Sequence, residues 1–321
     1  MPQQASSVAD APRGPLAALP GFVRESYAPG LHVAFAGAWF LALDGAFSLV
    51  SRGGWIPAPY LLSGVLQFFL VLFYLRAVDE WKDLDYDRIF NPDRPLVRGS
   101  VRLVDLWWYL GGAALLVVAL HFATPGLTGG SLVPLAILVL DMAYGLALAG
   151  AERRSPTLRE NMLLNLAATY PVNVALSVYA YSAWLARTGR PPSEEGVWVV
   201  VAFALAFLHY EFARKTAHPA RAKPGKRLYS AALGVGPAAA LTAAFATAAV
   251  VIVSALLAPR TAWGLLPLLA VIPALWGLAR FIRQGRSGSA AGPSAPMTPL
   301  AMAFLTLFYV SVLAAALLPR L

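Results

Sequence analysis

The sequence predicts an all-α integral membrane protein in which nine transmembrane helices pack as a bundle. Of its 321 residues, 59% are hydrophobic and only 13% are charged, and the mean hydropathy is +0.63. Apolar runs of about 20 residues, the length that crosses a bilayer, recur along the whole chain. This composition is too apolar for an ordinary soluble domain.

The apolar runs place the spans in order, at 31–50, 60–78, 103–122, 130–150, 160–186, 196–213, 229–257, 262–284 and 296–318. Residues 1–20 are rich in Ala, Pro, Gln and Ser and lack the basic and apolar stretches of a signal peptide, so we expect a disordered tail. A short interfacial helix is predicted near 16–27, and the segment 285–297 predicts a flexible linker. Residues 21–321 are expected to form a single transmembrane domain.

Basic residues predict the orientation of the bundle. If the N-terminus is cytoplasmic, nineteen Lys and Arg side chains fall on cytoplasmic segments and five on the opposite side, with Arg76 inside a span. The positive-inside rule strongly favours that arrangement. It places both charged loops, 79–102 and 211–228, in the cytoplasm. Topology then explains the net charge of +9, and no nucleic-acid partner is expected.

An acidic cluster at the end of the second span is the strongest indication of function. Five of the sixteen acidic residues occupy positions 79–87. Asp79, Asp83 and Asp87 stand at i, i+4 and i+8, so they line one flank of a helix, where each pair repels by roughly a few tenths of a kcal/mol. Carboxylate oxygens suit Mg²⁺, especially where a substrate phosphate completes the shell. The cluster therefore predicts a magnesium site.

A second charged segment follows the sixth span. Glu211 and Lys215 stand four residues apart, with Arg214 between them. Alone, this pattern is typical of an intrahelical ion pair at the membrane interface. Next to an acidic site on the same side, the two cations could instead hold a phosphate that magnesium also holds. Charged loops after helices two and six suggest two related halves that meet around one site.

Polar residues inside two other spans have two interpretations each. Asp141 is an intramembrane carboxylate and so a candidate functional group, or it is simply hydrogen-bonded between helices near Tyr144. An i+4 series along the fifth span indicates either helix packing or a cavity wall; its members are Asn161, Asn165, Thr169, Asn173 and Ser177. Asn161 and Asn165, nearest the cytoplasmic face, are the candidates for the site.

The chain offers few alternatives to carboxylate chemistry. It contains no cysteine, which excludes disulfides, thiol catalysis and thiolate metal sites. Its four histidines, at positions 32, 121, 209 and 218, are scattered without ligand spacing. A zinc site is therefore not expected.

The first charged segment resembles the UbiA superfamily of intramembrane prenyltransferases. The family motif Asn-Asp-x-x-Asp-x-x-x-Asp, followed by Pro-x-Arg-Pro and a glycine, is similar to Asp79-Glu80, Asp83 and Asp87, followed by residues 92–95 and Gly99. Charged loops after helices two and six are a further similarity, and the resemblance extends from about residue 25 onward. It implies a UbiA-like bundle around a central cavity.

The sequence departs from the family pattern in both motifs. Asp79 stands where the family has its leading Asn, and Glu80 where it has the first, shorter Asp. An Asp-x-x-x-Asp pair in the second motif is replaced by Glu211 and Lys215. Either one magnesium ion suffices, or Arg214 and Lys215 replace a second ion as the counter-charge of the diphosphate. The pattern resembles a divergent branch that includes UbiA-type membrane terpene cyclases.

The resemblance implies an enzyme that ionises an allylic isoprenyl diphosphate, drawn laterally from the lipid bilayer, with Mg²⁺ as cofactor. The expected metal ligands are Asp79, Glu80, Asp83 and Asp87. The side chains expected at the diphosphate are Arg88, Arg94, Asn161, Asn165, Arg214 and Lys215. Glu211 is expected to be a second metal contact or to orient Lys215.

Two fates of the resulting cation are compatible with these residues. Capture by the chain's own double bond gives a terpene cyclase, for which farnesyl diphosphate is favoured. Capture by an aromatic or other acceptor gives a prenyltransferase. A transporter or a non-catalytic scaffold is a third class, although a transporter should have polar or broken helices at mid-membrane. No protein partner is indicated.

Overall fold

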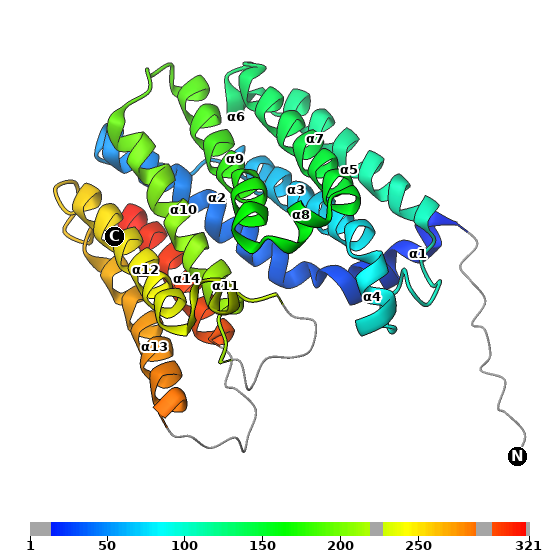
Figure 1. Ribbon diagram of the computed structural model, residues 1–321. Helices are drawn as coiled ribbons and strands as arrows, with labels where there is room; N and C mark the ends of the chain where they lie inside the picture. Colours follow the sequence, from blue (N-terminus) through cyan, green and yellow to red (C-terminus); the bar gives the residue numbers. More distant parts are fainter. Residues whose placement is uncertain (1–13, 219–226, 287–296, 319–321) are drawn as a thin grey trace, which may run out of the picture.

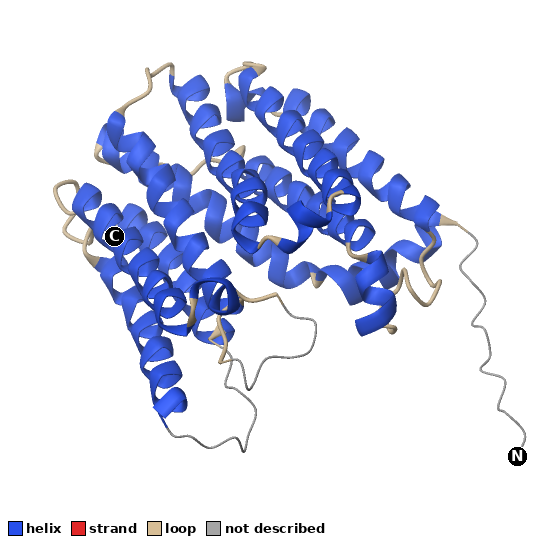
Figure 2. Cartoon of the chain, viewed as in Figure 1, coloured by secondary structure: helices blue, strands red, loops and turns tan. Residues whose placement is uncertain are grey.

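The computed structural model describes residues 14–218, 227–286 and 297–318, and all regular structure in these ranges is helical. Among the described residues, nine helices are long and apolar enough to cross a bilayer (Figure 1, Figure 2). They are α2 (Pro29–Arg52), α3 (Leu61–Lys82), α5 (Leu103–Ala123), α7 (Val133–Arg154), α9 (Met162–Thr188), α10 (Glu194–Arg214), α12 (Val235–Leu257), α13 (Val271–Arg286) preceded by the 3₁₀ helix η3 (Leu266–Ala270), and α14 (Thr298–Leu317). The predicted all-α bundle is confirmed.

Shorter helices lie before and between the long ones. They are α1 (Pro15–Phe22) with the π-helix η1 (Val23–Tyr27), α4 (Leu84–Phe90), α6 (Pro125–Thr128), α8 (Pro156–Glu160) and α11 (Tyr229–Leu233). Helix is thus present where the sequence predicts a short one before the first span. The segment predicted as the loop 79–102 is partly helical, because α3 continues to Lys82 and α4 follows.

Two predicted spans begin later than the hydropathy suggests. The span predicted at 229–257 is divided at Gly234, where φ is +89°, a conformation that residues with a side chain rarely adopt. The eighth span, predicted from 262, begins with η3 at Leu266. Most of the predicted tail 1–20 and most of the linker 285–297 lie outside the described residues.

Helix α2 lies at the centre of the bundle. It contacts α3, α9, α10, α12 and α14. Helices α3, α5 and α7 contact one another on one side, whereas α10, α12, α13 and α14 form the group on the other side (Figure 1). Helix α9 contacts both α7 and α10. A space between α3, α7, α9 and α10 is therefore bounded by α3 and α7 of the first group and by α10 of the second.

Two glycines allow the helices around that space to approach closely. A Cβ atom on Gly64 of α3 would lie 2.2 Å from the ring of Phe40 in α2, and one on Gly145 of α7 would lie 2.9 Å from Leu75 in α3. Small residues at such crossings are a common means of packing membrane helices. They fix the position of α3, whose end carries the acidic cluster.

The N-terminal segment is attached to α3 and α5. The Phe22 ring packs against Tyr109 with centroids 5.3 Å apart, and the Tyr109 hydroxyl donates to the Pro15 carbonyl at 2.8 Å. Arg76 Nε donates to the Ser26 carbonyl at 2.9 Å. Tyr27, the last residue of η1, stacks on His32 of α2. This segment therefore supports the beginning of α2.

A buried ion pair joins α2 and α9 near their C-terminal ends. Asp44 accepts hydrogen bonds from Trp55 Nε1 at 2.7 Å and from Arg187 Nη2 at 2.5 Å. The exposed fractions of the Asp44 and Arg187 side chains are 3% and 13%. We refer to Asp44, Trp55 and Arg187 as the Asp44 cluster. Along α2 it lies about 18 Å from His32, given a rise of 1.5 Å per residue.

Candidate functional site

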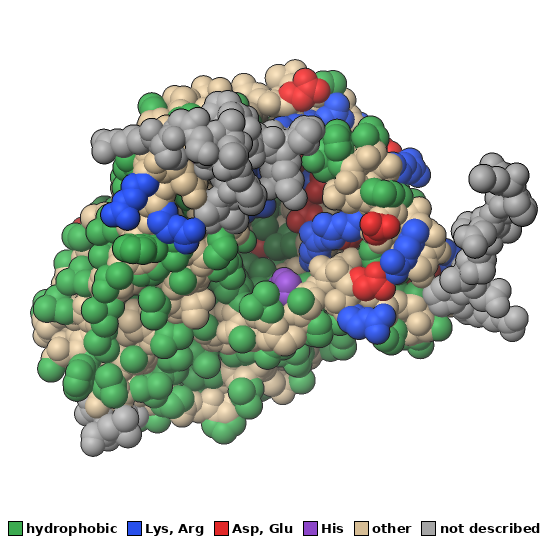
Figure 3. Space-filling view, turned by 90° about the horizontal axis from the view of Figure 1, so that it is seen from below, with side chains coloured by type: hydrophobic (Ala, Val, Ile, Leu, Met, Phe, Trp, Pro, Cys, Tyr) green, Lys and Arg blue, Asp and Glu red, His purple; other side chains and the backbone are tan. Residues whose placement is uncertain are grey.

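A cavity of about 330 Å³ lies between α2, α3, α7, α9 and α10. Charged side chains surround a hollow on the corresponding face of the molecule (Figure 3). The charged residues that line the cavity are Arg76, Asp79, Lys82, Glu152, Glu211, Arg214 and Lys215. The two charged segments predicted to meet around one site therefore do so.

The acidic side of the cavity is built from the ends of α3 and α7. Because α3 continues for one more turn than its apolar run, Asp79 and Lys82 lie on one face at i and i+3, with Lys82 Nζ 3.1 Å from Asp79 Oδ1. Lys82 Nζ is also 3.8 Å from Glu152 Oε2 of α7. Glu152 is buried, and the sequence analysis missed it because it precedes two arginines in an ordinary interfacial segment.

The three aspartates of the motif keep their helical register but differ in environment. Backbone N–H groups of Asp83, Asp87 and Asn91 each donate to the carbonyl four residues earlier, so the register continues across the junction of α3 and α4. Asp79 is half-exposed and Asp83 exposed. Asp87 is buried, and its Oδ1 accepts a hydrogen bond from Asn91 Nδ2 at 2.6 Å.

Asp83 has an altered acidity although solvent reaches its side chain. The neighbouring protein displaces part of the hydration of the carboxylate, which raises the pKa of Asp83 to about 6. Asp79, Asp87 and Glu152 act in the same direction, while Lys82 opposes them. Burial and the acidic neighbours both disfavour the charged form of Asp83, so a bound cation would stabilise that form.

Glu80 does not line the cavity. Its side chain is almost wholly buried and pairs with Arg76 and with Arg94, whose Nη1 lies 3.0 Å from Glu80 Oε1. Through these contacts Glu80 connects α3 to the Pro-x-Arg-Pro turn, and Arg76 connects both to the N-terminal segment. Arg94 is thus engaged by Glu80 rather than directed into the cavity.

Two further candidates also lie outside the cavity lining. Arg88 is exposed and pairs with Asp85 at 3.0 Å. Asn161 is the N-cap of α9, and its Oδ1 accepts hydrogen bonds from the backbone N–H of Leu163 and Leu164. The side chains of Ser, Thr, Asn and Asp commonly satisfy the first N–H groups of a helix in this way.

The basic side of the cavity is formed by the end of α10. Lys215 Nζ lies 2.7 Å from Glu211 Oε1, Arg214 Nε donates to Glu211 Oε2, and Tyr229 OH donates weakly to Glu211 at 3.4 Å. The intrahelical pair predicted from the spacing is present. Desolvation, followed by the charge of Arg214, lowers the pKa of Lys215, and Glu211 opposes this shift. Residues 219–226 of the same loop lie outside the described residues.

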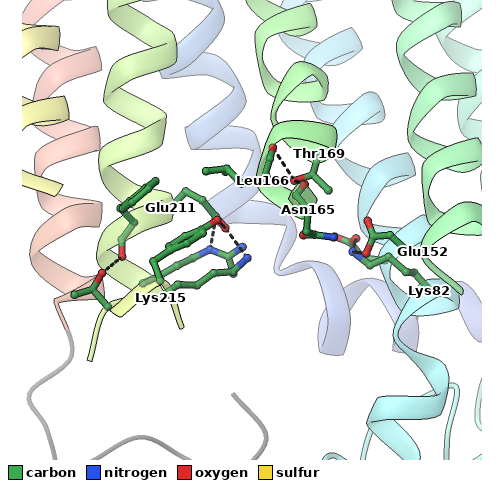
Figure 4. Close-up of polar contacts among 12 residues, drawn as sticks. Lys82, Glu152, Asn165, Leu166, Thr169, Glu211 and Lys215 are labelled. Carbon is green, nitrogen blue, oxygen red and sulfur yellow. Dashed lines mark hydrogen bonds and ion pairs between the residues drawn. The ribbon is translucent and has the colours of Figure 1, made fainter. Parts of the chain in front are cut away.

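A polar wall runs along α9 between the acidic and the basic side. Asn165, Thr169 and Asn173 line the cavity, and Thr169 donates to the Asn165 carbonyl (Figure 4). The side-chain amides of Asn165 and Asn173 have no hydrogen-bond partner among the described residues. The cavity-wall interpretation of this series is thus correct for three of its members, whereas Ser177 is buried elsewhere.

Asp141 remains without a partner in α7. Its side chain is buried, and its Oδ2 accepts no hydrogen bond within the described part of the chain. Tyr144 donates to the Ala168 carbonyl at 2.7 Å instead. Asp141 does not line the cavity, and the hydrogen bond between helices considered from the sequence is absent among the described residues.

The fold has a counterpart among solved structures. No family model and no curated protein matches the chain. The chain is similar to the solved structure of a digeranylgeranylglyceryl phosphate synthase studied in membranes, with a TM-score of 0.61 and 14% sequence identity. The match covers 93% of this chain and 98% of that one. The chain has the UbiA-type fold. At this identity the similarity concerns the fold alone.

The UbiA-type resemblance implies magnesium, and the side chains present fit one ion. Within the described residues, no three His, Asp or Glu side chains gather closely enough to hold a metal by themselves. Mg²⁺, however, is commonly bound by one or two carboxylates together with substrate phosphates and water. Asp79 and Asp83, one turn apart and accessible to solvent, meet that requirement. Glu211, already paired with two cations, does not provide a second such site.

Proposed function

We propose that this protein is a multi-pass membrane enzyme that ionises an allylic isoprenyl diphosphate and releases diphosphate. The cavity is the observation that best supports the proposal, because Asp79 and Lys82 of α3 and the pair Arg214 and Lys215 line one space. Similarity to the fold of a digeranylgeranylglyceryl phosphate synthase supports the same class of chemistry.

The end of α10 supplies cations to the leaving diphosphate. Glu211 holds Arg214 and Lys215 at the cavity when no ligand is bound. A diphosphate, with more charge than one carboxylate, offers both side chains a stronger partner. Arg88 and Arg94, also predicted from the sequence, lie outside the cavity lining, and so the proposed contacts are Arg214 and Lys215.

The proposed reaction breaks the C–O bond between the prenyl chain and the diphosphate. The electron pair leaves with the diphosphate, and an allylic cation remains. Electrostatic stabilisation of the leaving group by Arg214 and Lys215 is the kind of contribution that is usually largest. Magnesium at Asp79 and Asp83 would add a Lewis acid. Tyr170 and Phe207 line the same cavity, and aromatic rings stabilise cations.

Cyclisation of farnesyl diphosphate is the first candidate for the fate of the cation. The second motif supports it. Glu211 and Lys215 replace two aspartates there, and this pattern resembles the branch that includes UbiA-type terpene cyclases. In that reaction a double bond of the same chain captures the cation, and the cyclised cation loses a proton to the released diphosphate or to water, so that no second substrate is needed.

Transfer to an acceptor is the second candidate, and the polar wall of α9 favours it. Asn165 and Asn173 line the cavity with side-chain amides that have no hydrogen-bond partner among the residues that the structure describes. Unpaired amides are costly beside a purely hydrocarbon ligand, whereas an acceptor with hydroxyl or carbonyl groups would satisfy them. A prenyltransferase of this kind would bind its acceptor against α9.

One experiment tests the proposal and separates the two candidates. The purified protein in detergent would be incubated with Mg²⁺ and farnesyl or geranylgeranyl diphosphate, without acceptor, and diphosphate release and volatile hydrocarbons would be measured. A cyclic terpene identifies a cyclase. Release only after addition of aromatic or hydroxyl acceptors identifies a transferase. Absence of release under every condition contradicts the proposed function and favours a scaffold.

We also propose that the cavity opens toward the cytoplasm, on the basis of the distribution of basic residues. The chain contains no native cysteine, so single cysteines can report its orientation. In intact cells, Arg190→Cys should react with an impermeant maleimide, whereas Arg154→Cys should react only after permeabilisation. The opposite pattern would reverse the orientation.

A further inference from the structure

Lys82 lies where the acidic groups of the cavity come together. Its ammonium group is 3.1 Å from Asp79 Oδ1 and 3.8 Å from Glu152 Oε2, and Asp83 is within electrostatic range. Figure 4 shows Lys82 and Glu152 close together on one side, with Glu211 and Lys215 together on the other. The Lys82 side chain lines the cavity and is 21% exposed.

The ammonium group of Lys82 therefore competes with a metal ion for Asp79, the carboxylate that the ion pair and the proposed metal site share. A divalent cation between Asp79 and Asp83 would lie close to this positive charge, and like charges at such distances repel strongly unless water screens them. Lys82 has a flexible four-carbon stem and a compact charge with three donors, so its ammonium group can leave Asp79 without any change in the helices.

The cavity lining carries enough positive charge to accept an anion. Four cationic and three anionic side chains line it. A diphosphate that enters between α3 and α10 provides Lys82 with an alternative partner, since lysine commonly binds phosphate as a point charge. Movement of Lys82 onto the diphosphate then leaves Asp79 and Asp83 free for the metal.

We propose that Lys82 is an exchangeable counter-ion of this site: it neutralises Asp79 and Glu152 in the empty enzyme and becomes a diphosphate-binding residue in the loaded one. Diphosphate and metal then favour each other's binding, and the coupling is reciprocal. The inference rests on the proposed function in that it takes a diphosphate as the ligand.

Lys82→Met tests the inference through binding alone. With the purified full-length protein in detergent, the affinity for Mn²⁺ without diphosphate would be measured by electron paramagnetic resonance. The affinity for radiolabelled inorganic diphosphate would be measured separately, in the presence of a chelator. Loss of one nearby positive charge should raise the Mn²⁺ affinity about tenfold and lower the diphosphate affinity about tenfold.

Arg154→Met is the matched control, because Arg154 is an exposed cation at the end of α7 that does not line the cavity. Both affinities of this variant should stay within about twofold of the original protein, since exposed charges at a distance are screened. Affinities that fall together in Lys82→Met, or an Mn²⁺ affinity that does not rise, would overturn the inference. Suppose that Lys82→Met shifts the Mn²⁺ and diphosphate affinities in opposite directions, but the protein never releases diphosphate from allylic substrates. That result would support the inference and contradict the proposed function.

Discussion

The two ends of the bundle place charge in different environments. In the Asp44 cluster, Asp44 is bonded to Trp55 and Arg187, and both charged side chains are almost excluded from solvent. At the cavity, Asp79 and Arg214 have exposed fractions of 48% and 44%. Each cavity carboxylate is also paired with a lysine or arginine that sits on a flexible stem.

This difference separates a structural ion pair from a binding site. Replacing a partner in the Asp44 cluster would leave a buried charge uncompensated, which is strongly unfavourable. At the cavity, Glu152 and Glu211 are buried, but water and a ligand can replace the present partner of an exposed side chain such as Asp79 or Arg214 at little cost, because exposed pairs contribute little to stability. Substitutions at the Asp44 cluster should therefore reduce stability, and those at the cavity should reduce binding and turnover.

The largest effect is expected at Asp83. Asp83→Ala should reduce magnesium-dependent diphosphate release to below detection, because it removes one carboxylate of the proposed metal pair: Asp79 lines the cavity, and Asp83 lies one turn further along, exposed to solvent. Asp85→Ala is the matched control: Asp85 is exposed and pairs with Arg88 and Arg153, and activity should be retained. Turnover by Asp83→Ala at the original rate would exclude the metal assignment.

A large effect on stability is expected at the opposite end. Arg187→Met should destabilise the protein by about 3–5 kcal/mol, because it leaves Asp44 buried and unpaired. Turnover per folded molecule should not change. The double variant Asp44→Leu with Arg187→Met should recover most of the stability, which denaturant titration in mixed micelles would measure. A stable single variant would mean that water reaches Asp44.

The spans and the acidic cluster could be predicted from the sequence, but the direction of each carboxylate could not. The nine spans could be predicted because hydrocarbon requires long apolar helices, and the acidic cluster was evident from its density of charge. Which carboxylate faces the cavity could not be predicted. Glu80 is turned away by Arg94, fourteen residues later, and such a contact depends on how the turn after α4 packs against α3.

The positions of other side chains at the site also depend on contacts between helices and could not be predicted from the sequence. Glu152 is placed opposite Lys82 by the close crossing of α3 and α7 at Gly145, and nothing in its own segment indicates that. Spacing alone identified the series on α9, but only the position of α9 beside α10 and α7 distinguishes the lining residue Asn173 from the buried Ser177.

A smaller effect is expected at the basic side. Lys215→Ala should raise KM for the isoprenyl diphosphate or lower kcat by about tenfold, the usual scale for one charge-assisted contact. Lys215→Arg should restore part of the loss because it retains the charge. Steady-state kinetics with both variants checks this, and unchanged constants in Lys215→Ala would remove Lys215 from the proposed diphosphate site.

The smallest effect is expected at Asp141. Unlike Asp44, this buried carboxylate has no hydrogen-bond partner for its Oδ2 in the described part of the chain. Asp141→Leu should change the free energy of unfolding by less than about 1 kcal/mol or should increase it, since no hydrogen bond is lost. The same denaturant titration would measure it. A loss as large as that of Arg187→Met would show that Asp141 has a partner.

The attachment of the N-terminal segment has a consequence for the order of assembly. Tyr109 follows the Pro15 carbonyl that it binds by 94 residues, and Arg76 follows its partner Ser26 by 50. At synthesis rates of about 5–20 residues per second, the first helix waits roughly 5–20 seconds for α5 to emerge. The segment Pro15–Tyr27 is thus fixed only after the third span, α5, has been made, and its support of α2 near His32 is completed at that point.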